Sequence, residues 1–423
     1  MLHAVEIKPD IYWVGGIDWN ERNFHGYTTD RGSTYNAYLI VDEHPTLIDT
    51  CKQGFAEELI ERVSEIIDPS KIEYIVANHV EQDHSGALPI LHELAPEAKI
   101  YCSAPHGLKG LTAHYGDLGY VPVKTGDSLC IGKRTLHFTQ TVMVHWPDNM
   151  VTYCPEDRIL FSNDAFGQHF ASSKRFDDEV GLPEVLAQAK KYYANIVMPY
   201  SRHVVKALGV LGGLDIDMIA PSHGVIWRSH VSEILKTYAQ WSSLEPEKYA
   251  IVVYDSMWHT TETMAREIVE AFVECGVPAR LFDLKANHIS DIMTEMLSAK
   301  YVAVGSPTLN NGMMPTVAAF LCYLKGLSPK GGWAGRVGIP FGSYGWGTNG
   351  PDEVASQLEA CGLDMPLGTL SHQWTEDEQH LGELQDAIVA AVKGTLGDAS
   401  PVAQEEAAWA RALQSDAARE SAK

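Results

Sequence analysis

The first 240 residues alternate short apolar runs with polar segments, in a pattern that indicates strands and helices in about equal measure. Runs rich in β-branched and aromatic residues predict strands over 35–41, 46–49, 72–77, 135–140 and 158–162. Apolar residues recur at helical spacing over 182–197, at Val185, Leu186, Ala189, Tyr192 and Tyr193. We therefore expect an α/β sandwich in this part of the chain.

A different pattern begins after the polar, proline-containing segment 240–250. Strand-like runs over 250–254, 301–304 and 337–341 are each followed by a loop of Gly, Ser, Thr or Asn, and helices clearly follow two of them. This alternation predicts a parallel, doubly wound sheet. We expect one domain over 1–248, a second over 249–395, and an Ala- and Glu-rich tail over 396–423 that forms one weak helix or stays mobile.

Composition and charge narrow the class of protein. With 423 residues, of which 45% are apolar and 21% charged, the chain can form two folded domains. A net charge of −23 and no cluster of basic residues weigh against nucleic-acid binding. The chain has neither a membrane-spanning apolar stretch nor the features of a signal peptide, so we expect no membrane association and a cytoplasmic location. The seven cysteines form no CxxC pair, which argues against a rubredoxin or iron–sulfur segment and predicts reduced thiols.

The segment NHVEQDHSG, residues 78–86, carries the first chemical signal. It places two imidazoles and two carboxylates directly after an apolar strand, at His79, Glu81, Asp83 and His84. The two carboxylates would repel each other unless a cation lies between them, although a solvated polar turn is the alternative. Three further side chains of ligand type follow apolar runs, namely His145, Asp164 and His223. Four imidazoles and three carboxylates suffice for two adjacent metal ions that share one carboxylate.

Three loops in the second half follow predicted strands, at the edge where doubly wound sheets bind ligands. The loop YDSMWHTTETMA opens a helix, and its backbone N–H groups and hydroxyls suit a phosphate, with ordinary helix capping as the alternative. It matches neither GxxxxGK[ST] nor GxGxxG, which disfavours an NTPase or a dinucleotide fold. The other two loops are GSPTLNNGMMP and FGSYGWGTNG, in which Tyr344 and Trp346 are placed to cover a flat ring.

The motif HVEQDH, with His145, Asp164 and His223 downstream, resembles the metallo-β-lactamase superfamily in the variant found in flavodiiron proteins. The hydrolases of that superfamily have HxHxDH, whereas this chain has Glu81 at the second ligand position, which favours iron over zinc. The second half resembles flavodoxin, whose ligand is FMN. The resemblance covers residues 1–395 and implies a metallo-β-lactamase-like αββα sandwich followed by a flavodoxin-like doubly wound parallel sheet.

The resemblance also implies roles for individual residues. One iron is expected on His79, Glu81 and His145 and the other on Asp83, His84 and His223, with Asp164 bridging; His84 is the least secure ligand because its counterpart leaves the metal in some members. His25 and Tyr193 are expected in the wall of the catalytic pocket. The residues expected at FMN are Ser256, Met257, Trp258, His259, Thr260 and Thr261 for the phosphate, and Pro307, Thr308, Leu309, Asn310, Ser343, Tyr344, Gly345 and Trp346 for the isoalloxazine.

The activity implied is reduction of O2 to water, of NO to N2O, or both, in a head-to-tail homodimer or a dimer of such dimers. Electrons would come from a separate donor, rubredoxin or a reduced deazaflavin, because the chain has no CxxC pair and no NAD fingerprint. Two other classes remain open at this point. One is a zinc-dependent hydrolase with an accessory flavodoxin-like domain, and the other is a non-catalytic electron carrier or redox sensor.

Overall fold

The computed structural model describes residues 2–395, which divide into two compact units. The first unit contains the residues up to Tyr193 together with Arg202–Ala239. The second contains Ala194–Ser201 and the chain from Gln240 onward. The domain boundary predicted at 248/249 stays a prediction, and the predicted tail over 396–423 lies outside the described residues.

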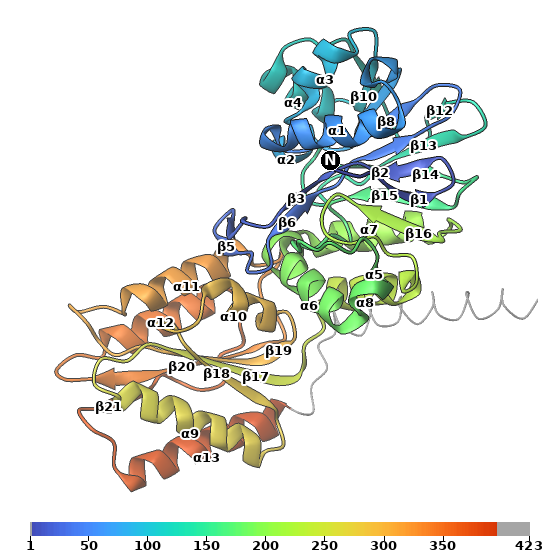
Figure 1. Ribbon diagram of the computed structural model, residues 1–423. Helices are drawn as coiled ribbons and strands as arrows, with labels where there is room; N and C mark the ends of the chain where they lie inside the picture. Colours follow the sequence, from blue (N-terminus) through green and yellow to red (C-terminus); the bar gives the residue numbers. More distant parts are fainter. Residues whose placement is uncertain (1, 396–423) are drawn as a thin grey trace, which may run out of the picture. The chain divides into compact units, whose positions relative to one another are not determined.

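Two β-sheets form the centre of the first unit (Figure 1). The larger sheet has the strand order β1-β2-β7-β8-β9-β10-β11, and the smaller has the order β12-β13-β14-β15-β16. The strands of the larger sheet are β1 (Val5–Lys8), β2 (Ile11–Trp13), β7 (Tyr38–Ile40), β8 (Thr46–Ile48), β9 (Tyr74–Ala77), β10 (Lys99–Ser103) and β11 (Tyr120–Val123). Those of the smaller sheet are β12 (Ser128–Cys130), β13 (Thr135–Gln140), β14 (Met150–Cys154), β15 (Ile159–Asn163) and β16 (Met218–Pro221). Two short ribbons pair β3 (Gly16–Asp18) with β6 (Ser33–Tyr35) and β4 (Asn23–Phe24) with β5 (Tyr27–Thr28).

Alternate residues of the central strands point to opposite faces of the larger sheet. Leu47 and Ile75 join the core beneath the outer helices, whereas Ile48 and Val76 join the core between the two sheets. The helices on this outer side are α1 (Ala56–Ile66), α2 (Gln82–Ser85), α3 (Leu88–Leu94) and α4 (His106–Tyr115), with the 3-10 turns η1 (Gln53–Phe55) and η2 (Pro69–Lys71). The smaller sheet has on its side α5 (Asp177–Val180), α6 (Leu182–Tyr192), α7 (Ser201–Leu211) and α8 (Val231–Ser243). The predicted αββα sandwich is confirmed.

The helix predicted over 182–197 is shorter than its apolar pattern indicated. The α-helical part ends at Tyr192, and a π-helical segment, η3 (Tyr193–Val197), leads into the 3-10 turn η4 (Met198–Tyr200). Pro199, which has no backbone N–H group to donate, lies in this 3-10 turn.

The second unit is a parallel five-stranded sheet with the order β18-β17-β19-β20-β21. Its strands are β17 (Glu247–Tyr254), β18 (Ala279–Asp283), β19 (Ala299–Gly305), β20 (Val337–Tyr344) and β21 (Leu370–Gln373). One face carries α9 (Thr260–Glu274) and α13 (Glu378–Thr395), and the other carries α10 (Ile289–Met296), α11 (Pro315–Gly326) and α12 (Asn349–Ala360) (Figure 1). Ile268 of α9 and Ile388 of α13 pack with Val252 and Ile339 of the sheet in one apolar core. This strand order is that of flavodoxin-like sheets, as predicted.

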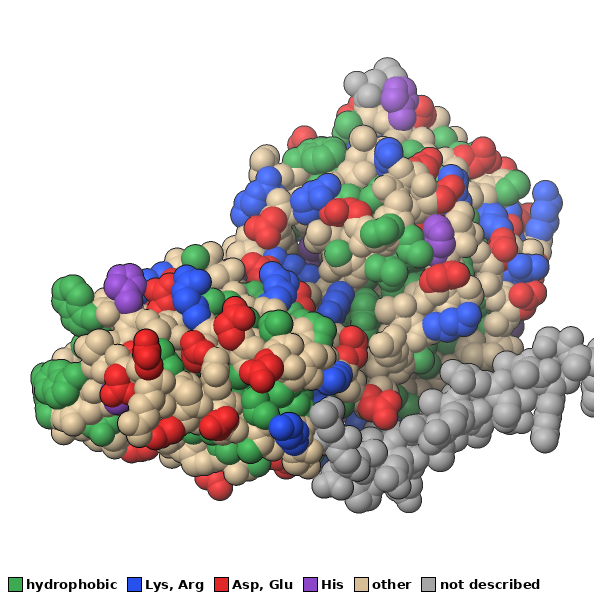
Figure 2. Space-filling model, turned by 90° about the horizontal axis from the view of Figure 1, so that it is seen from below, with side chains coloured by type: hydrophobic (Ala, Val, Ile, Leu, Met, Phe, Trp, Pro, Cys, Tyr) green, Lys and Arg blue, Asp and Glu red, His purple; other side chains and the backbone are tan. Residues whose placement is uncertain are grey.

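The surface agrees with the composition. On the face drawn in Figure 2, acidic and basic side chains of the described residues are interspersed and form no continuous basic patch. Every helix within residues 2–395 is too short or too polar to span a bilayer.

Candidate metal centre and flavin loops

The side chains predicted to bind metal come from one edge of the first unit, where several strands end. His79 and Glu81 follow β9, and Asp83 and His84 lie in the single turn of α2 that comes next. The remaining three are His145 between β13 and β14, Asp164 after β15, and His223 after β16. His79, Asp164 and His223 each lie within two residues of the end of a buried strand, which fixes the backbone from which they project.

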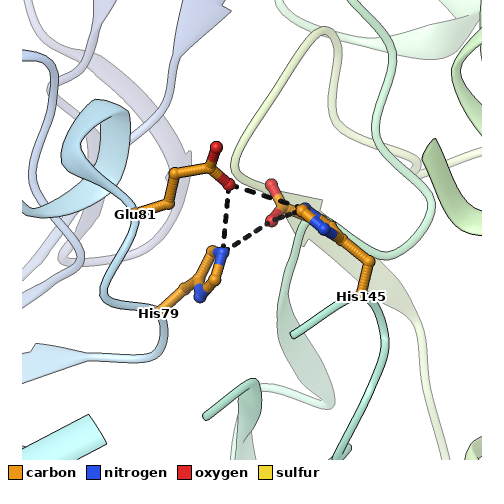
Figure 3. A group of neighbouring side chains, drawn as sticks. His79, Glu81 and His145 are labelled. Carbon is orange, nitrogen blue, oxygen red and sulfur yellow. Dashed lines mark hydrogen bonds and ion pairs between the residues drawn. The ribbon is translucent and has the colours of Figure 1, made fainter. Parts of the chain in front are cut away.

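The structure gathers these side chains into two groups whose ligand atoms lie within 4.8 Å of one another, namely His79, Glu81, His145 and Asp164, and Asp83, His84 and His223. Figure 3 shows the labelled members of the first group pointing toward one another. Oε2 of Glu81 lies 3.2 Å from Nε2 of His79 and 3.6 Å from Nε2 of His145. In the second group, Asp83 lies 3.4 Å from His84 and 3.2 Å from His223.

Asp164 lies between the two groups and presents one oxygen to each. Its Oδ2 is 3.2 Å from Nε2 of His145 and 3.6 Å from Nε2 of His79. Its Oδ1 is 3.0 Å from Nε2 of His84 and 3.5 Å from Nε2 of His223. A carboxylate in this position can be shared by two metal ions, and the bridging role of Asp164 stays a prediction.

The donor set suits cations because its charges are buried and incompletely satisfied. Glu81, Asp83 and Asp164 are 8%, 5% and 1% exposed. Both carboxylate oxygens of Asp83 and of Asp164, and Nε2 of His84, have no hydrogen-bond partner among the described residues. Leaving such groups unsatisfied costs about 1–3 kcal/mol each, and more when they are charged. Metal ions would remove this cost, and mixed carboxylate and imidazole donors suit iron.

The pKa values of these groups reflect the same crowding of charge. Burial alone would raise the pKa of Glu81, but hydrogen bonds from His25 and His79 outweigh it and hold the pKa below its usual value. Burial is likewise outweighed at Asp164, whose pKa is held low by His84 and His145. Burial disfavours the charged form of His84, yet Asp83 and Asp164 raise its pKa to about 9. Without metal, protons on His79 and His84 balance part of the carboxylate charge, so metal binding must displace them.

Two of the imidazoles are held in place by contacts to their Nδ1 atoms. Nδ1 of His79 lies 2.7 Å from Oδ2 of Asp148, which also accepts the backbone N–H of Val80 at 2.8 Å. Nδ1 of His223 donates to the carbonyl oxygen of Thr34 at 2.6 Å. These bonds direct both Nε2 atoms toward the other members of the ligand groups. By contrast, Nδ1 of His84 is buried without a hydrogen-bond partner in the described structure.

Asp148 was missed in the sequence analysis, although it follows His145 by three residues in HWPDN. A carboxylate close to a proposed histidine ligand is a common second partner of the imidazole. Asp148 contacts His79 and not the nearby His145, so no local pattern in the sequence could have identified its role.

The residues predicted for the pocket wall fall in two places. His25, in the turn between β4 and β5, is exposed, and its Nε2 lies 2.6 Å from Oε1 of Glu81. This bond raises the pKa of His25. Tyr193 packs its ring 5.1 Å from that of Tyr238, whereas the ring of Tyr192 lies 6.0 Å from His223. A role for Tyr193 in the wall stays a prediction, and Tyr192 has the shorter ring contact with a proposed ligand.

A buried histidine that the sequence analysis did not single out completes the aromatic surroundings. His169 is 4% exposed, and its ring lies 4.5 Å from His223, 4.4 Å from Phe24 and 5.1 Å from Tyr192. Its Nδ1 is 2.6 Å from Oγ of Ser33, and Nε2 has no hydrogen-bond partner within residues 2–395. Burial, followed by His223, holds its pKa well below the usual value. It is therefore a neutral imidazole beside the second group.

The first of the flavin loops joins β17 to α9 in the second unit. Ser256 is 6% exposed, and its Oγ is buried without a hydrogen-bond partner among the described residues. His259 has a φ of 70° immediately before the first turn of α9, which begins at Thr260. The start of a helix presents unpaired N–H groups to an anion, and the unsatisfied Ser256 hydroxyl adds one more hydrogen-bonding group. The loop thus has the donors that a terminal phosphate requires.

The three predicted loops lie together at the carboxyl edge of the sheet. Thr261 of the first loop shares a 2.9 Å hydrogen bond with Ser343 of the third. The N–H of Thr308, in the second loop, donates to the carbonyl of Ser343 at 3.0 Å. The second loop continues through Pro307, Leu309 and Asn310, the last with a φ of 50°.

Large side chains at these loops are exposed to solvent. Trp258 and Trp346 are 87% and 86% exposed, and Met257 is 39% exposed. A fourth loop, after β21, contributes Trp374, which the sequence analysis missed; its ring lies 6.3 Å from that of Trp346. A Cβ atom on Gly345 would lie 3.0 Å from the Trp374 ring, so a larger residue there would require the ring to move. Exposed aromatic rings beside a phosphate site suit a flat, phosphorylated ligand such as FMN.

Comparisons with known proteins give a family match for each half of the chain. Residues 34–224 match the family described as ODP family beta lactamase, and residues 252–415 match flavodoxin. A nitric oxide reductase from Moorella thermoacetica is 44% identical over 404 residues, which cover 93% of this chain and 100% of that protein. A rubredoxin-oxygen oxidoreductase from Megalodesulfovibrio gigas is 42% identical, with the same coverage. The crystal structure of the flavodiiron protein from Giardia intestinalis superposes with a TM-score of 0.90 at 36% identity, over 96% of this chain and 99% of that one. The chain therefore belongs to the flavodiiron protein family.

Proposed function

We propose that this protein is an oxidoreductase that uses FMN and two irons to reduce O2 to water, NO to N2O, or both. The observation that carries the proposal is the pair of buried ligand groups joined by Asp164 in a chain that also has a flavodoxin-like unit. When bound, the irons would take up the gas and FMN would relay electrons to them from an external donor. The relatives named nitric oxide reductase and rubredoxin-oxygen oxidoreductase support both gases as substrates and rubredoxin as a donor.

Iron at this site is supported by Glu81. A hydrolase on the same scaffold would use zinc and would have an imidazole where Glu81 stands. Its reaction would not involve the flavin loops. Carboxylate oxygens stabilise the additional positive charge of an oxidised iron better than a third imidazole would. Metal analysis separates the two functions, because two irons per chain are expected here and two zincs in the hydrolase.

The surrounding residues position the ligands. The hydrogen bond from His25 to Oε1 of Glu81 leaves Oε2 directed toward His79 and His145. The rings of Phe24, Tyr192 and His169 lie around His223 and give this side of the site aromatic surroundings. We place His25 and Tyr193 in the catalytic pocket as part of the proposal.

Electron transfer gives a reason for the predicted assembly. Tunnelling falls steeply with distance, and the ligand groups and the flavin loops belong to different units of the chain. A head-to-tail dimer, or a dimer of such dimers, would bring the flavin of one subunit to the irons of its partner. Gas reduction should then fall with dilution as dimers dissociate, and full activity of the monomer would refute this arrangement. A cytoplasmic location and a deazaflavin as a second possible donor belong to the same proposal.

The central experiment uses the purified protein containing iron and FMN, reduced under anaerobic conditions. Addition of NO should yield one N2O for every two NO consumed, or addition of O2 should yield water without accumulation of hydrogen peroxide. A simple electron carrier would become reoxidised without these stoichiometries. Failure to consume either gas, in protein that retains two irons and FMN, would refute the proposed function.

A matched variant tests the ligand assignment. Glu81→Ala should lose iron and gas consumption while the visible spectrum of the flavin stays intact, because Glu81 belongs to the first unit and the flavin loops to the second. Retention of both irons in this variant would contradict the assignment.

A further inference from the structure

A buried ion pair lies next to the first flavin loop and has no part in the ligand sets described above. Asp255 directly follows β17 and is 1% exposed. Its Oδ1 accepts the backbone N–H of Ser256 at 2.6 Å and lies 2.9 Å from Nζ of Lys285. Lys285, which follows β18, also donates to the carbonyl oxygen of Ser256. The ammonium and the carboxylate therefore both contact Ser256, whose hydroxyl is buried without a partner among the described residues.

The second carboxylate oxygen of Asp255 joins this pair to the second flavin loop. Oδ2 accepts the hydroxyl of Thr316, in the first turn of α11, at 2.5 Å. The N–H of Asp255 donates to the carbonyl oxygen of Gly305, the last residue of β19, at 3.2 Å. Asp255 thus connects segments that follow β17, β18 and β19 at the carboxyl edge of the sheet. Because these contacts hold the carboxylate in place, its negative charge stays close to the loop proposed to bind the phosphate.

This negative charge opposes the binding of a phosphate. A phosphate monoester such as FMN carries a charge of roughly −1.5 to −2 near pH 7. Asp283, whose Oδ1 accepts the N–H of Lys285 at 2.8 Å, adds a further carboxylate nearby. Like charges at short range repel, so an anion at Ser256 requires a cation close to Asp255. The hydrogen bond with Asp255 raises the pKa of Lys285, so Lys285 is charged at neutral pH and meets this requirement.

We propose that Lys285, paired with Asp255, makes the flavin loops selective for a phosphorylated flavin over a neutral one. Lys285 is a positioning residue, because it offsets the charge of the Asp255 carboxylate and holds the carbonyl of Ser256 without being placed on the flavin itself. This role rests on the proposed function, since it requires the FMN phosphate to bind in the first flavin loop. A side chain that served folding alone would affect the binding of both kinds of flavin equally.

The test compares FMN with riboflavin, which has the same ring system but no phosphate. Each flavin is titrated into full-length, flavin-free protein that retains its iron, and flavin fluorescence reports binding. Lys285→Gln leaves the buried carboxylate of Asp255 without its cation, so FMN affinity should fall roughly tenfold. Riboflavin affinity should stay within about twofold of wild type, because riboflavin carries no charge for the carboxylate to repel.

Two further variants separate charge from shape. Lys285→Arg keeps the positive charge and should retain most of the preference for FMN. The double variant that combines Asp255→Asn with Lys285→Gln removes both charges and keeps an acceptor oxygen at position 255, so its FMN affinity should return to within about threefold of wild type. The matched control is Lys330→Gln, which makes the same change of net charge in the exposed loop before β20, at the opposite edge of the sheet. It should bind both flavins as wild type does.

The outcomes separate this role from the proposed function. Urea unfolding of each flavin-free variant shows whether the fold is retained. An equal loss of affinity for FMN and riboflavin in Lys285→Gln would overturn the proposal, as would unchanged affinity for both. A double variant that binds FMN as weakly as Lys285→Gln would also overturn it, because the loss would then not depend on charge. In these cases FMN binding by wild type, and with it the proposed function, would stand, whereas wild type that bound neither flavin would refute both.

Discussion

The metal centre and the flavin loops differ in how far the protein prepares each site for its ligand. Asp164 at the metal centre is 1% exposed and lies among imidazoles, whereas Trp258 and Trp346 at the flavin loops are 87% and 86% exposed. The metal centre thus holds buried charges that are stable only with cations or protons between them. The flavin loops hold hydroxyls and apolar rings that tolerate water. We therefore expect metal removal to disturb stability and pH dependence, and FMN removal to leave the fold largely unchanged.

The largest effect should come from the residue that joins the two ligand groups. Asp164→Ala removes one ligand oxygen from each group and leaves four imidazoles near only two carboxylates. Both irons should be lost, and gas consumption should fall below detection, while FMN binding persists. Iron analysis and the flavin spectrum of the same sample measure the contrast. Retention of one iron per chain would mean that Asp164 belongs to a single ion and does not bridge.

The metal-free protein should show a pH dependence that the iron-loaded protein lacks. The folded pKa of His84 is about 9, against an unfolded value of about 6.5. Its protonation therefore stabilises the fold fully below pH ~6.5, and this contribution of roughly 3 kcal/mol is lost as the pH rises through about 9. Urea unfolding of chelated protein between pH 6 and pH 9.5 measures it.

Two controls sharpen that prediction. The iron-loaded protein should lose less stability over the same range, because a metal-bound imidazole is already neutral. Chelated His84→Gln protein lacks the titrating group and should also show a smaller change. An identical decline in all three proteins would assign the pH dependence to other groups.

An intermediate effect is expected from Asp148, which fixes His79 without being a ligand itself. Asp148→Ala removes the 2.7 Å contact to Nδ1 of His79 and the acceptor for the N–H of Val80. Loss of such a supporting carboxylate typically weakens metal binding about 10–100-fold. Competition with a chelator would measure iron affinity, and Asp148→Asn, which keeps one acceptor oxygen, should lose less. Equal iron affinity in wild type and Asp148→Ala would show that the backbone alone orients His79.

The ligands and their supports differ in how well the sequence predicted them. His79, Glu81, Asp83 and His84 lie within six residues after one strand, and strand ends gather at one edge of a sheet, so local pattern was sufficient. The support of His79 by Asp148 spans 69 residues and depends on the loop between β13 and β14. No periodicity in the sequence encodes such a contact.

The missed aromatic residues have a similar explanation. Tyr192 and Tyr193 are adjacent in the chain, but the ring of Tyr192 lies near His223, whereas that of Tyr193 packs against Tyr238. At the flavin loops, β21 has the polar sequence LSHQ and carries no strand signal, so the loop that follows it was not counted. Trp374 was missed for that reason, although its ring lies near Trp346.

The smallest effect is expected at the exposed site. Ser256→Ala removes a hydroxyl that is unsatisfied in the described structure and lies where the FMN phosphate is proposed to bind. A hydrogen bond to a charged group contributes about 1.5 kcal/mol at the lower end of its range, which is expected for one donor among several backbone N–H groups, so FMN affinity should fall roughly tenfold. Fluorescence titration of FMN into the flavin-free protein measures this change.

Thr263→Ala, which removes an exposed hydroxyl from the same helix start, is the matched control and should bind FMN as wild type does. Iron content should be equal in all three proteins, since the metal centre depends on side chains of the other unit. Unchanged FMN affinity in Ser256→Ala would place the phosphate elsewhere, and a parallel loss of iron would show that the two sites are coupled more strongly than their separate units suggest.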